Sequence, residues 1–418
     1  MLDFYKKNRF ELLSKIKQQS IVLLFSNSRN INLDLLFDLN KNFYYLTGIS
    51  ENNIALLMIK EFNGENKTFL FLERPSLLKK KWDGESLNLE EASKISYIPL
   101  ENCLDINSLD SFLINLLNNS KRNSLDMIQN VYLDFSFSSL DKNNLSLDKS
   151  DWLKTNYPYV DIHDISVFLS EMRITKKKEE ISFMSKAVDI NREAFQEIIP
   201  FLKSDFYEYQ ISAFYNYFLA NLGLKSSFNT IVATGKNATV LHYNKQKDLI
   251  KSHDLILLDL GVSYNNYASD VSRCFPVSGT FTPQQKLIYN IVLKANKKII
   301  EWVKPGHTFF DINQYGKNIL SDELQKNHLL KKDETIEKYC YHGLSHYLGL
   351  DVHDVGSINK PILENSVITV EPGLYFEEFN LGIRIEDDVL IKKEKNIVLT
   401  KDIPKEIEEI EYLMSQRK

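Results

Sequence analysis

The chain has 418 residues, of which 43% are hydrophobic and 26% are charged, and its formal net charge is −5. A chain of this length exceeds the usual size of one hydrophobic core, so we expect two domains. The composition is that of a globular protein, and the acidic balance argues against nucleic acid as a partner.

The cysteines and the N-terminus indicate the compartment. Three cysteines lie far apart in the sequence, and none has a Cys-x-x-Cys spacing. This pattern argues against a disulfide framework and a thiolate metal site, and it favours a reducing environment. The charged N-terminus lacks the apolar core of a signal peptide, and no apolar run approaches the ~20 residues of a membrane span. We therefore expect a cytoplasmic protein without a membrane partner.

The first 170 residues alternate predicted strands with predicted helices. Helical spacing of apolar residues predicts a helix over 2–18, and a continuous apolar run predicts a strand over 20–25. The same criteria predict strands at 54–59, 68–72 and 131–135 and helices at 88–95 and 107–118. The Asn- and Ser-rich stretch 138–150 has the composition of a surface connection. The alternation indicates an α/β domain.

Residues 171–418 form the second predicted domain. The segment that starts at Arg173 opens a long helical region, and its apolar residues recur at helical spacing as far as Ile198. A second helix fits 207–222 and ends before Gly223, a residue type that suits a helix C-terminal cap. Strands dominate from Ile231 onward, with helices expected at 283–303 and 308–327. We find no internal repeat and no low-complexity segment.

Three of the eight histidines, His342, His346 and His353, fall within twelve positions. Gly343 and Gly349 disfavour a long helix there. The zinc-protease pattern places Glu directly after its first His, and Gly343 occupies that place, so this mechanism is excluded. Histidines also cluster by chance as core or surface residues. The acidic residues nearby favour a functional interpretation.

Four acidic residues interrupt apolar, strand-like runs: Asp259, Asp270, Glu371 and Glu386. Asp270 follows Asp259 by 11 positions in a predicted hairpin, which can bring both acids to one end of a two-stranded ribbon. Each acid alone could face solvent, as Asp and Glu usually do. Burial of four unpartnered carboxylates would cost several kcal/mol each, so together they indicate a metal site.

The ligand types indicate which metal chemistry to expect. Four carboxylates and one imidazole suit manganese, cobalt or iron better than a metal that prefers thiolates. Five ligands exceed what one catalytic ion takes while it keeps an open position, whereas two ions ~3.5–4 Å apart use all five. Four negative charges also balance two divalent cations. Metal-assisted hydrolysis by a deprotonated bridging water is therefore the predicted reaction.

The motifs around these residues resemble the aminopeptidase P family, the Xaa-Pro aminopeptidases of the pita-bread metallopeptidases. The resembling segments of the second domain are Leu258–Gly261, Ser269–Arg273, His342–Asp354, Thr369–Tyr375 and Gly382–Asp388. In the first domain Phe43–Gly48 and Trp82–Gly84 are similar more weakly, and Asn40-Lys-Asn42 stands where the family has Gln-Asn. The resemblance implies an α/β N-terminal domain over 1–170. It implies an α+β pita-bread catalytic domain with a curved antiparallel sheet over 171–418.

The resemblance also implies a ligand set for two divalent ions. Mn²⁺ is expected first, with Co²⁺, Fe²⁺ or Zn²⁺ as alternatives. The implied ligands are Asp259, Asp270, His346, Glu371 and Glu386. By resemblance Asp259 chelates one ion, Asp270 and Glu386 bridge both ions, and His346 and Glu371 complete the second.

Further roles are implied for the residues around the ligands. Glu371 would accept a proton as the bridging hydroxide attacks the scissile carbonyl, and His353 would donate a hydrogen bond to the resulting oxyanion. His242 and His342 would shape the pocket for the proline ring and the residue after it. Arg384 and Tyr375 would orient Asp259, although an Arg beside an acid is often a simple ion pair.

The implied function is removal of the N-terminal residue from peptides with proline in second position. An Xaa-Pro dipeptidase shares the five ligands and is the nearest alternative, although Ser345 favours the aminopeptidase. Methionine aminopeptidase would leave the first domain unexplained. A catalytically inactive pita-bread binding protein, or a creatinase-like hydrolase without metal, would be expected to lack ligands. The resemblance further implies a homo-oligomer, either a dimer or a tetramer.

Overall fold

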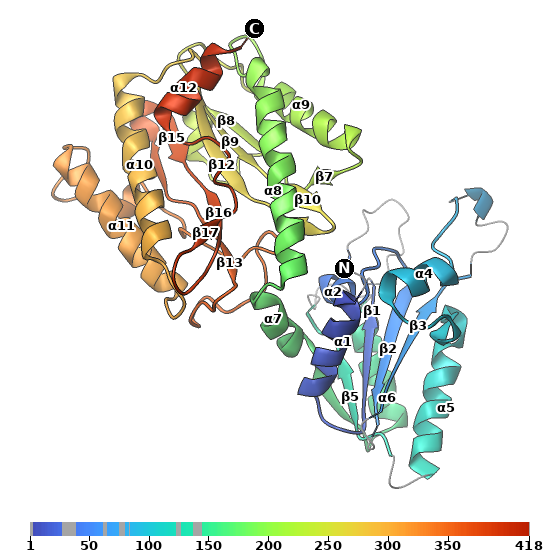
Figure 1. Ribbon diagram of the computed structural model, residues 1–418. Coiled ribbons are helices and arrows are strands. Elements are labelled where there is room, and N and C mark those ends of the chain that lie inside the picture. The colour runs from blue at the N-terminus through green and yellow to red at the C-terminus, as the bar shows by residue number, and fades with distance from the viewer. Residues whose placement is uncertain are drawn as a thin grey trace. The chain divides into compact units, whose positions relative to one another are not determined.

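The computed structural model describes residues 3–26, 39–61, 65–74, 80–82, 84–122, 127–136 and 144–417. The chain divides into two compact units, Met1–Met172 and Arg173–Lys418 (Figure 1). Among the described residues, none of the helices combines the length and the apolar composition that a membrane span requires.

The first unit is built on a six-stranded mixed sheet, ordered β4-β3-β2-β1-β5-β6. The strands are β1 (Ser20–Phe25), β2 (Ile54–Lys60), β3 (Asn66–Leu72), β4 (Cys103–Asp105), β5 (Asn130–Leu133) and β6 (Asp161–Asp164). Strand β2 is antiparallel to β1 and β3, and the remaining pairs are parallel. The strands predicted from apolar runs form the middle of the sheet, and the α/β prediction is confirmed.

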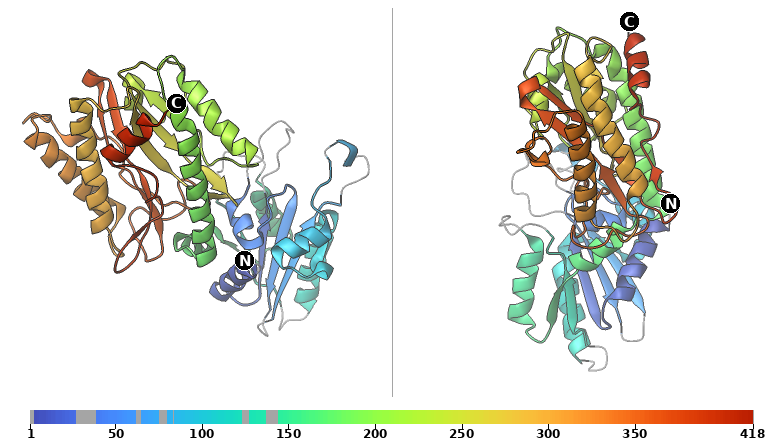
Figure 2. Two further views of the ribbon diagram at one scale, coloured as in Figure 1. Left: turned by 45° about the horizontal axis from the view of Figure 1, so that its top comes forward. Right: turned by 90° about the vertical axis from the view of Figure 1, so that its left-hand side faces the viewer.

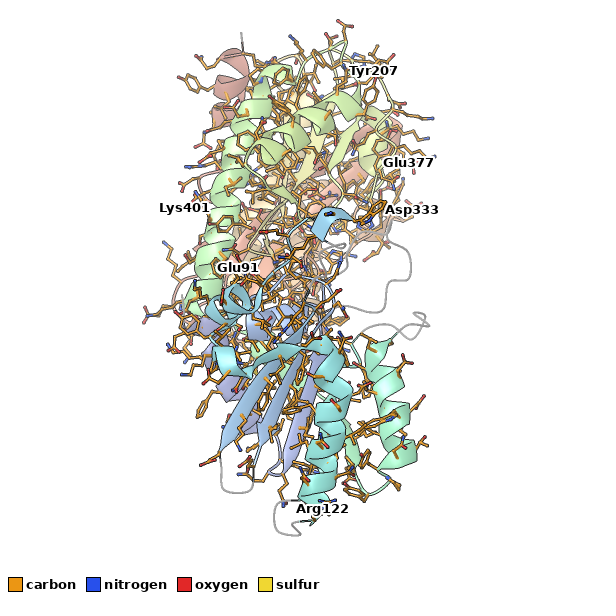
Figure 3. All side chains as sticks on the ribbon, turned by 90° about the vertical axis from the view of Figure 1, so that its right-hand side faces the viewer. Glu91, Arg122, Tyr207, Asp333, Glu377 and Lys401 are labelled. Carbon is orange, nitrogen blue, oxygen red and sulfur yellow. The ribbon has the colours of Figure 1, made fainter. Side chains whose placement is uncertain are left out.

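Helices flank this sheet. They are α1 (Phe4–Lys15), α2 (Lys41–Thr47), α4 (Leu89–Ser96), α5 (Leu109–Arg122), α6 (Leu145–Asn156) and α7 (Ser166–Ile174), with 3-10 turns η1 (Leu100–Asn102) and η2 (Ile106–Ser108). Helix α4 begins with a capping box, in which Asn88 accepts from the Glu91 N–H and the Glu91 side chain accepts from the Asn88 N–H. Glu91 is labelled in Figure 3 on this first turn.

The surface connection predicted over 138–150 is wrong for its second half. Residues 137–143 lie outside the described part of the chain, and α6 begins at Leu145. The Asn144 side chain caps this helix, because it accepts from the N–H groups of Ser146 and Leu147. Leu153 is fully buried and anchors the helix in the core. Composition alone suggested a loop because Asn and Ser favour both turns and helix caps.

The second unit places helices against antiparallel strands. The helices are α8 (Lys178–Ile198), α9 (Glu208–Asn221), α10 (Pro283–Trp302), α11 (Phe309–Lys326) and α12 (Ile407–Ser415), with 3-10 turns η3 (Ile199–Phe201), η4 (Gly235–Thr239), η5 (Ile336–Lys338) and η6 (Glu377–Phe379). In Figures 1 and 2, α10 and α11 lie side by side. Helices α8 and α9 contact strands early in the unit, and α10 contacts later ones.

Four antiparallel sheets form among the described residues of this unit. Their strands are β7 (Lys225–Ser226), β8 (Ile231–Thr234), β9 (Leu255–Leu260), β10 (Val262–Tyr264), β11 (Tyr267–Ala268), β12 (Val271–Pro276), β13 (Val367–Val370), β14 (Gly373–Phe376), β15 (Leu381–Arg384), β16 (Asp387–Leu390) and β17 (Ile397–Val398). The predicted α+β domain with antiparallel strands is confirmed. The sheet is divided because the strands are short and are interrupted at residues such as Gly261 and Pro372.

The three cysteines are free and buried. Burial raises the pKa of Cys103 to about 11, that of Cys274 to about 12 and that of Cys340 to about 11. All three thiols are therefore protonated at neutral pH, and none has the character of a nucleophile or a thiolate ligand.

Candidate metal centre

One cavity of about 280 Å³ in the second unit contains side chains of nine predicted site residues. These are His242, Asp259, Asp270, His342, His346, His353, Glu371, Arg384 and Glu386. The tenth, Tyr375, lies directly behind the cavity wall, where its hydroxyl is 2.9 Å from Nε2 of His342. Residues up to 144 positions apart in the sequence are thus brought together.

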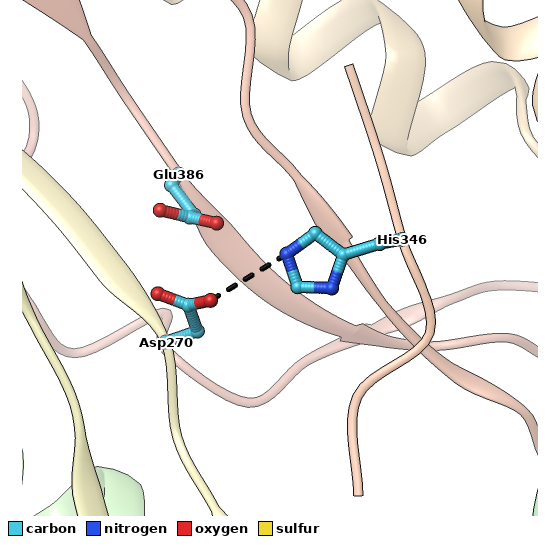
Figure 4. Close-up of side chains that lie close together, drawn as sticks. All are labelled: Asp270, His346 and Glu386. Carbon is cyan, nitrogen blue, oxygen red and sulfur yellow. Dashed lines mark ion pairs between the residues drawn. The ribbon is translucent and has the colours of Figure 1, made fainter. Parts of the chain in front are cut away.

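Asp270, His346 and Glu386 line the cavity and point toward one another from three segments of the chain (Figure 4). One potential ligand atom of each lies within 4.8 Å of the others. Nε2 of His346 is 3.5 Å from Oδ2 of Asp270 and also 3.5 Å from Oε1 of Glu371. A cation placed among these atoms would find two or three carboxylates and one imidazole.

Strand pairing explains why the acids converge. Strands β13 and β16 are antiparallel, with Val370 opposite Asp387, so Glu371 after one strand and Glu386 before the other share an end. Strands β9 and β12 are also antiparallel, with Ser272 opposite Asp259, so Asp270 just before β12 lies near Asp259. Both pairs therefore present two acids at one edge.

The acids repel one another in the absence of cations. Burial, followed by the charge of Glu386, raises the pKa of Asp270 well above its ordinary value. Burial and the charge of Glu371 do the same to the pKa of Glu386. Burial raises the pKa of Glu371 to about 8. Carboxylates in this state require positive charge nearby to ionise together at neutral pH.

Two of the three clustered histidines, His342 and His346, are uncharged at neutral pH. Burial lowers the pKa of His346 to about 4 and that of His342 to about 3. Nδ1 of His346 is 2.9 Å from the carbonyl oxygen of Tyr347, a contact that fixes the proton on Nδ1. The lone pair of Nε2 then faces Asp270 and Glu371, as a metal-ligating imidazole requires.

Arg384 connects several of the predicted residues. Its Nη2 donates to Oδ2 of Asp259 at 2.6 Å, its Nε donates to Oγ of Ser272 at 2.8 Å, and its Nη1 donates to the Tyr375 hydroxyl at 3.2 Å. Ser272 in turn donates to Oε2 of Glu386 at 2.7 Å. The guanidinium therefore orients one acid directly and a second through a hydroxyl.

The residues fit a pair of divalent cations. Oδ1 of Asp259 is buried and has no hydrogen-bond partner among the described residues, although Oδ2 is bound by Arg384. An unpartnered buried carboxylate oxygen is costly unless it coordinates an ion. The donor set consists of carboxylate oxygens and one imidazole nitrogen, which suits a divalent ion that is not thiolate-loving.

A larger cavity, about 590 Å³, lies elsewhere in the second unit and is lined by six lysines and two glutamates. Several of these lysines already have partners. Lys297 pairs with Glu406, Lys393 with Glu364, and Lys405 with Asp387. The smaller cavity differs in that it gathers four acidic side chains, and among the described residues the arginine or lysine paired with them is Arg384.

Comparison with known proteins decides the family. The "Metallopeptidase family M24" profile matches residues 182–393, and the "Aminopeptidase P, N-terminal domain" profile matches residues 5–125. The Xaa-Pro aminopeptidase of Haemophilus influenzae is 33% identical over 434 residues, which cover 98% of this chain and 97% of that protein. The chain belongs to the aminopeptidase P family.

Solved structures of aminopeptidase P agree with this assignment. The zinc-substituted Escherichia coli aminopeptidase P in complex with product superposes with a TM-score of 0.89 at 28% identity, covering 100% of this chain and 99% of that one. The curated Xaa-Pro aminopeptidase of Escherichia coli is 31% identical over 98% of this chain and 97% of its own length. The predicted family, its fold and a metallo-aminopeptidase activity are confirmed, and the roles of individual residues stay predictions.

Glu208 supports this aminopeptidase P site from outside the cavity, and no motif in the sequence pointed to it. Glu208 is fully buried at the start of α9. Its carboxylate accepts from five donors: the Thr234 N–H, the Thr234 hydroxyl, the Asn237 amide, the Tyr243 hydroxyl and the Asp248 N–H. It thereby fixes the segment that carries His242. The surrounding Tyr-Glu-Tyr-Gln sequence gave no signal of burial.

Arg273 also had no assigned role. The side chain is fully buried, and Nη1 donates to the backbone oxygen of Glu386 at 2.6 Å while Nη2 donates to Oδ1 of Asp387 at 2.8 Å. The signal was present in the sequence, because a charged Arg in the apolar run of β12 needs a partner. The partner, more than 100 residues away, could not be read from the sequence.

Proposed function

We propose that this chain removes the N-terminal residue from peptides whose second residue is proline, with two divalent metal ions held by the five predicted ligands. The observation that carries the proposal is the convergence of Asp270, His346 and Glu386 within 4.8 Å, with Asp259 and Glu371 in the same cavity. Membership of the aminopeptidase P family supports the reaction class. We propose Mn²⁺ as the native ion, with Co²⁺, Fe²⁺ or Zn²⁺ as substitutes.

When bound, the ions supply a Lewis acid and lower the pKa of a coordinated water toward neutrality. Glu371 lines the cavity with Oε1 3.5 Å from Nε2 of His346, and once bound cations hold it ionised it would accept a proton during the attack and pass it to the departing proline nitrogen. His353 lines the same cavity, with its ring centroid 4.4 Å from that of His346, and would donate a hydrogen bond to the developing oxyanion.

The remaining residues hold the substrate and the ligands. His242 and His342 line the cavity and bound the space for the proline ring and the following residue. The Tyr375 hydroxyl contacts both His342 and Arg384, and so it ties the histidine to the guanidinium that orients Asp259. Contacts of this kind set the direction of ligand lone pairs.

We also propose the domain division, the assembly and the location. Residues 1–170 act as the N-terminal domain and residues 171–418 as the catalytic domain. The chain associates as a dimer or a tetramer, and light scattering that reports a monomer at working concentration would remove this part. We place the protein in the cytoplasm, a location that its three free cysteines support. Fractionation of cells that produce the protein tests the location.

The test uses purified protein that has been stripped of metal with a chelator. Single metals are added back, and cleavage of an Xaa-Pro-Xaa tripeptide is compared with cleavage of an Xaa-Pro dipeptide and of an Xaa-Ala-Xaa tripeptide. We expect metal-dependent release of the first residue from the Xaa-Pro-Xaa peptide. Preferential cleavage of the dipeptide would instead identify an Xaa-Pro dipeptidase. No cleavage with any metal, despite normal metal binding, would refute the peptidase proposal.

A further inference from the structure

The loop from His346 to Asp354 closes on itself beside the candidate metal centre. The rings of His346 and His353 meet edge to face, with centroids 4.4 Å apart. The N–H of Asp354 donates to the carbonyl of Tyr347 at 2.9 Å, and the same carbonyl lies 2.9 Å from Nδ1 of His346. One backbone oxygen therefore links a predicted ligand to the residue that follows His353.

Two basic side chains, Arg173 and Lys176, bind the last residue of this loop although they lie far from it in the sequence. Oδ1 of Asp354 accepts from Nη2 of Arg173 at 2.6 Å, and Oδ2 accepts from Nζ of Lys176 at 2.9 Å. Arg173 also donates to Oδ2 of Asp351 at 2.7 Å. The side chains of Asp354 and Lys176 are each 1% exposed, and that of Arg173 is 3% exposed.

Burial of three charged side chains costs free energy, so each of them needs an oppositely charged partner. Burial by itself would raise the pKa of Asp354, and the charges of Lys176 and Arg173 outweigh it and hold the pKa below its ordinary value. Buried ion pairs add little net stability compared with apolar side chains of similar volume, and their best-attested use is to specify one conformation. The conformation specified here is that of the loop.

The loop backbone is fitted to the carboxylate. A Cβ at Gly349 would lie 2.1 Å from Oδ2 of Asp354, so only glycine allows the chain to pass this closely. The carbonyl of Gly349 accepts from the N–H of Ala268 at 2.8 Å, which joins the loop to the strand preceding Asp270. The position of Asp354 is thus fixed on the side-chain and the backbone sides.

We propose that Asp354, clamped by Arg173 and Lys176, is a positioning residue for the reaction, because it fixes the backbone from which His353 reaches the substrate. The inference rests on the proposed function of His353 as the donor to the oxyanion. A donor to the oxyanion acts in the transition state, so loosening the clamp lowers kcat and leaves KM nearly unchanged. A displacement of about 1 Å can cost ~100-fold in rate.

The first experiment compares Lys176→Met and Asp354→Asn with the wild-type enzyme loaded with Mn²⁺. We expect kcat to fall by about 10- to 100-fold, with KM and the measured metal content within about twofold. Lys176→Arg keeps the charge and should recover most of the rate. Leu320→Ala, a truncation in the buried face of α11, serves as the control for general destabilisation. If its rate falls as far at equal loss of thermal stability, the clamp is merely structural and the inference is overturned.

The second experiment is a double-mutant cycle with His353→Ala. If the clamp acts through His353, Lys176→Met should cost little further rate once His353 is absent. Additive losses would overturn the inference and leave the role of His353 intact. A His353→Ala enzyme with wild-type kcat would instead refute the proposed function of His353. The two failures are therefore distinguishable.

Discussion

Arg384 and Asp259 are bound to each other across 2.6 Å in a buried position, although they lie 125 positions apart in the chain. The contact occupies one oxygen of Asp259 and leaves Oδ1 without a partner among the described residues. The Arg384 guanidinium therefore fixes one oxygen of this carboxylate, and the other oxygen is available to a metal ion. The orientation of this candidate ligand thus depends on a planar, fork-shaped donor.

Arg384→Lys should therefore weaken metal binding, because an ammonium cannot contact Asp259, Ser272 and Tyr375 from one position. We expect a loss of about 10- to 100-fold in metal affinity and in kcat/KM. Titration of the chelated protein with Mn²⁺, followed by calorimetry, measures the affinity. Tyr375→Phe removes one anchor of the guanidinium and leaves its direct contact with Asp259, so it should lower metal affinity less than Arg384→Lys does. Equal affinities for Arg384→Lys and wild type would contradict the orienting role.

Acid usually lowers the stability of a folded protein, but the metal-free form of this protein should become more stable as the pH falls from about 8 to 5. In the metal-free state burial raises the pKa of Glu371 to about 8, whereas the unfolded chain releases that proton near its ordinary pKa of about 4.3. Folding then takes up a proton between these values. The free energy of unfolding should accordingly fall as pH rises from about 5 to 8, by up to ~1.4 kcal/mol per pH unit for one proton.

Thermal unfolding with a chelator and with Mn²⁺, each measured between pH 5.5 and 8, checks this dependence. The stabilisation by Mn²⁺ should be larger at pH 8 than at pH 5.5, because ligand protons must leave before the metal binds. Glu371→Gln removes the titrating group, so its metal-free stability should depend less steeply on pH. A metal-free wild type whose stability rises toward pH 8 would contradict the raised pKa.

Glu208→Gln should destabilise the segment that carries His242. The carboxylate accepts hydrogen bonds from five donor groups, whereas the NH2 group of a glutamine would face N–H and O–H groups that also donate. We expect a loss of about 1–3 kcal/mol in the free energy of unfolding, measured with urea, together with a raised KM. Tyr243→Phe removes one of the five donors and should cost about 1 kcal/mol. A fully stable Glu208→Gln protein would show that the network is not tightly matched.

Gly382→Ala tests a close backbone approach. A Cβ at Gly382 in β15 would lie 1.9 Å from the carbonyl oxygen of Ala238 in η4, so one of the two segments must move. We expect destabilisation of about 1–3 kcal/mol and a loss of activity, because η4 leads directly to His242. Gly343→Ala is the matched control for stability, since its Cβ would have no neighbour nearer than 3.9 Å. Equal stability of both variants would show that the backbone yields easily at Gly382.

Local sequence signals predicted most elements of the fold. Helix α10 begins at Pro283 after the cap residue Thr282, and β1 covers the apolar run Ser20–Phe25, because capping and apolar periodicity act over a few residues. The short strands β4 and β6 were not predicted, since three or four residues carry too little periodicity. Strands at the edge of a sheet depend on their neighbours more than on their own sequence.

The sequence likewise predicted some residues of the candidate site and missed others. Acids inside apolar runs, such as Asp259 and Glu371, reveal themselves because their burial needs compensation. The partners that place them do not, since Arg173 and Asp354 are joined only by the fold, 181 positions apart in the chain. Glu208 was missed because its neighbours are polar and aromatic, and only the structure shows the carboxylate to be enclosed.

The burial of every thiol has a practical consequence. Cys103 belongs to the first compact unit, and Cys274 and Cys340 belong to the second. Alkylating reagents should therefore leave the native enzyme untouched and label each sulfur only when its own unit opens. Mass spectrometry of the labelled peptides would measure the unfolding rate of each unit separately, and the native cysteines would serve as the labels.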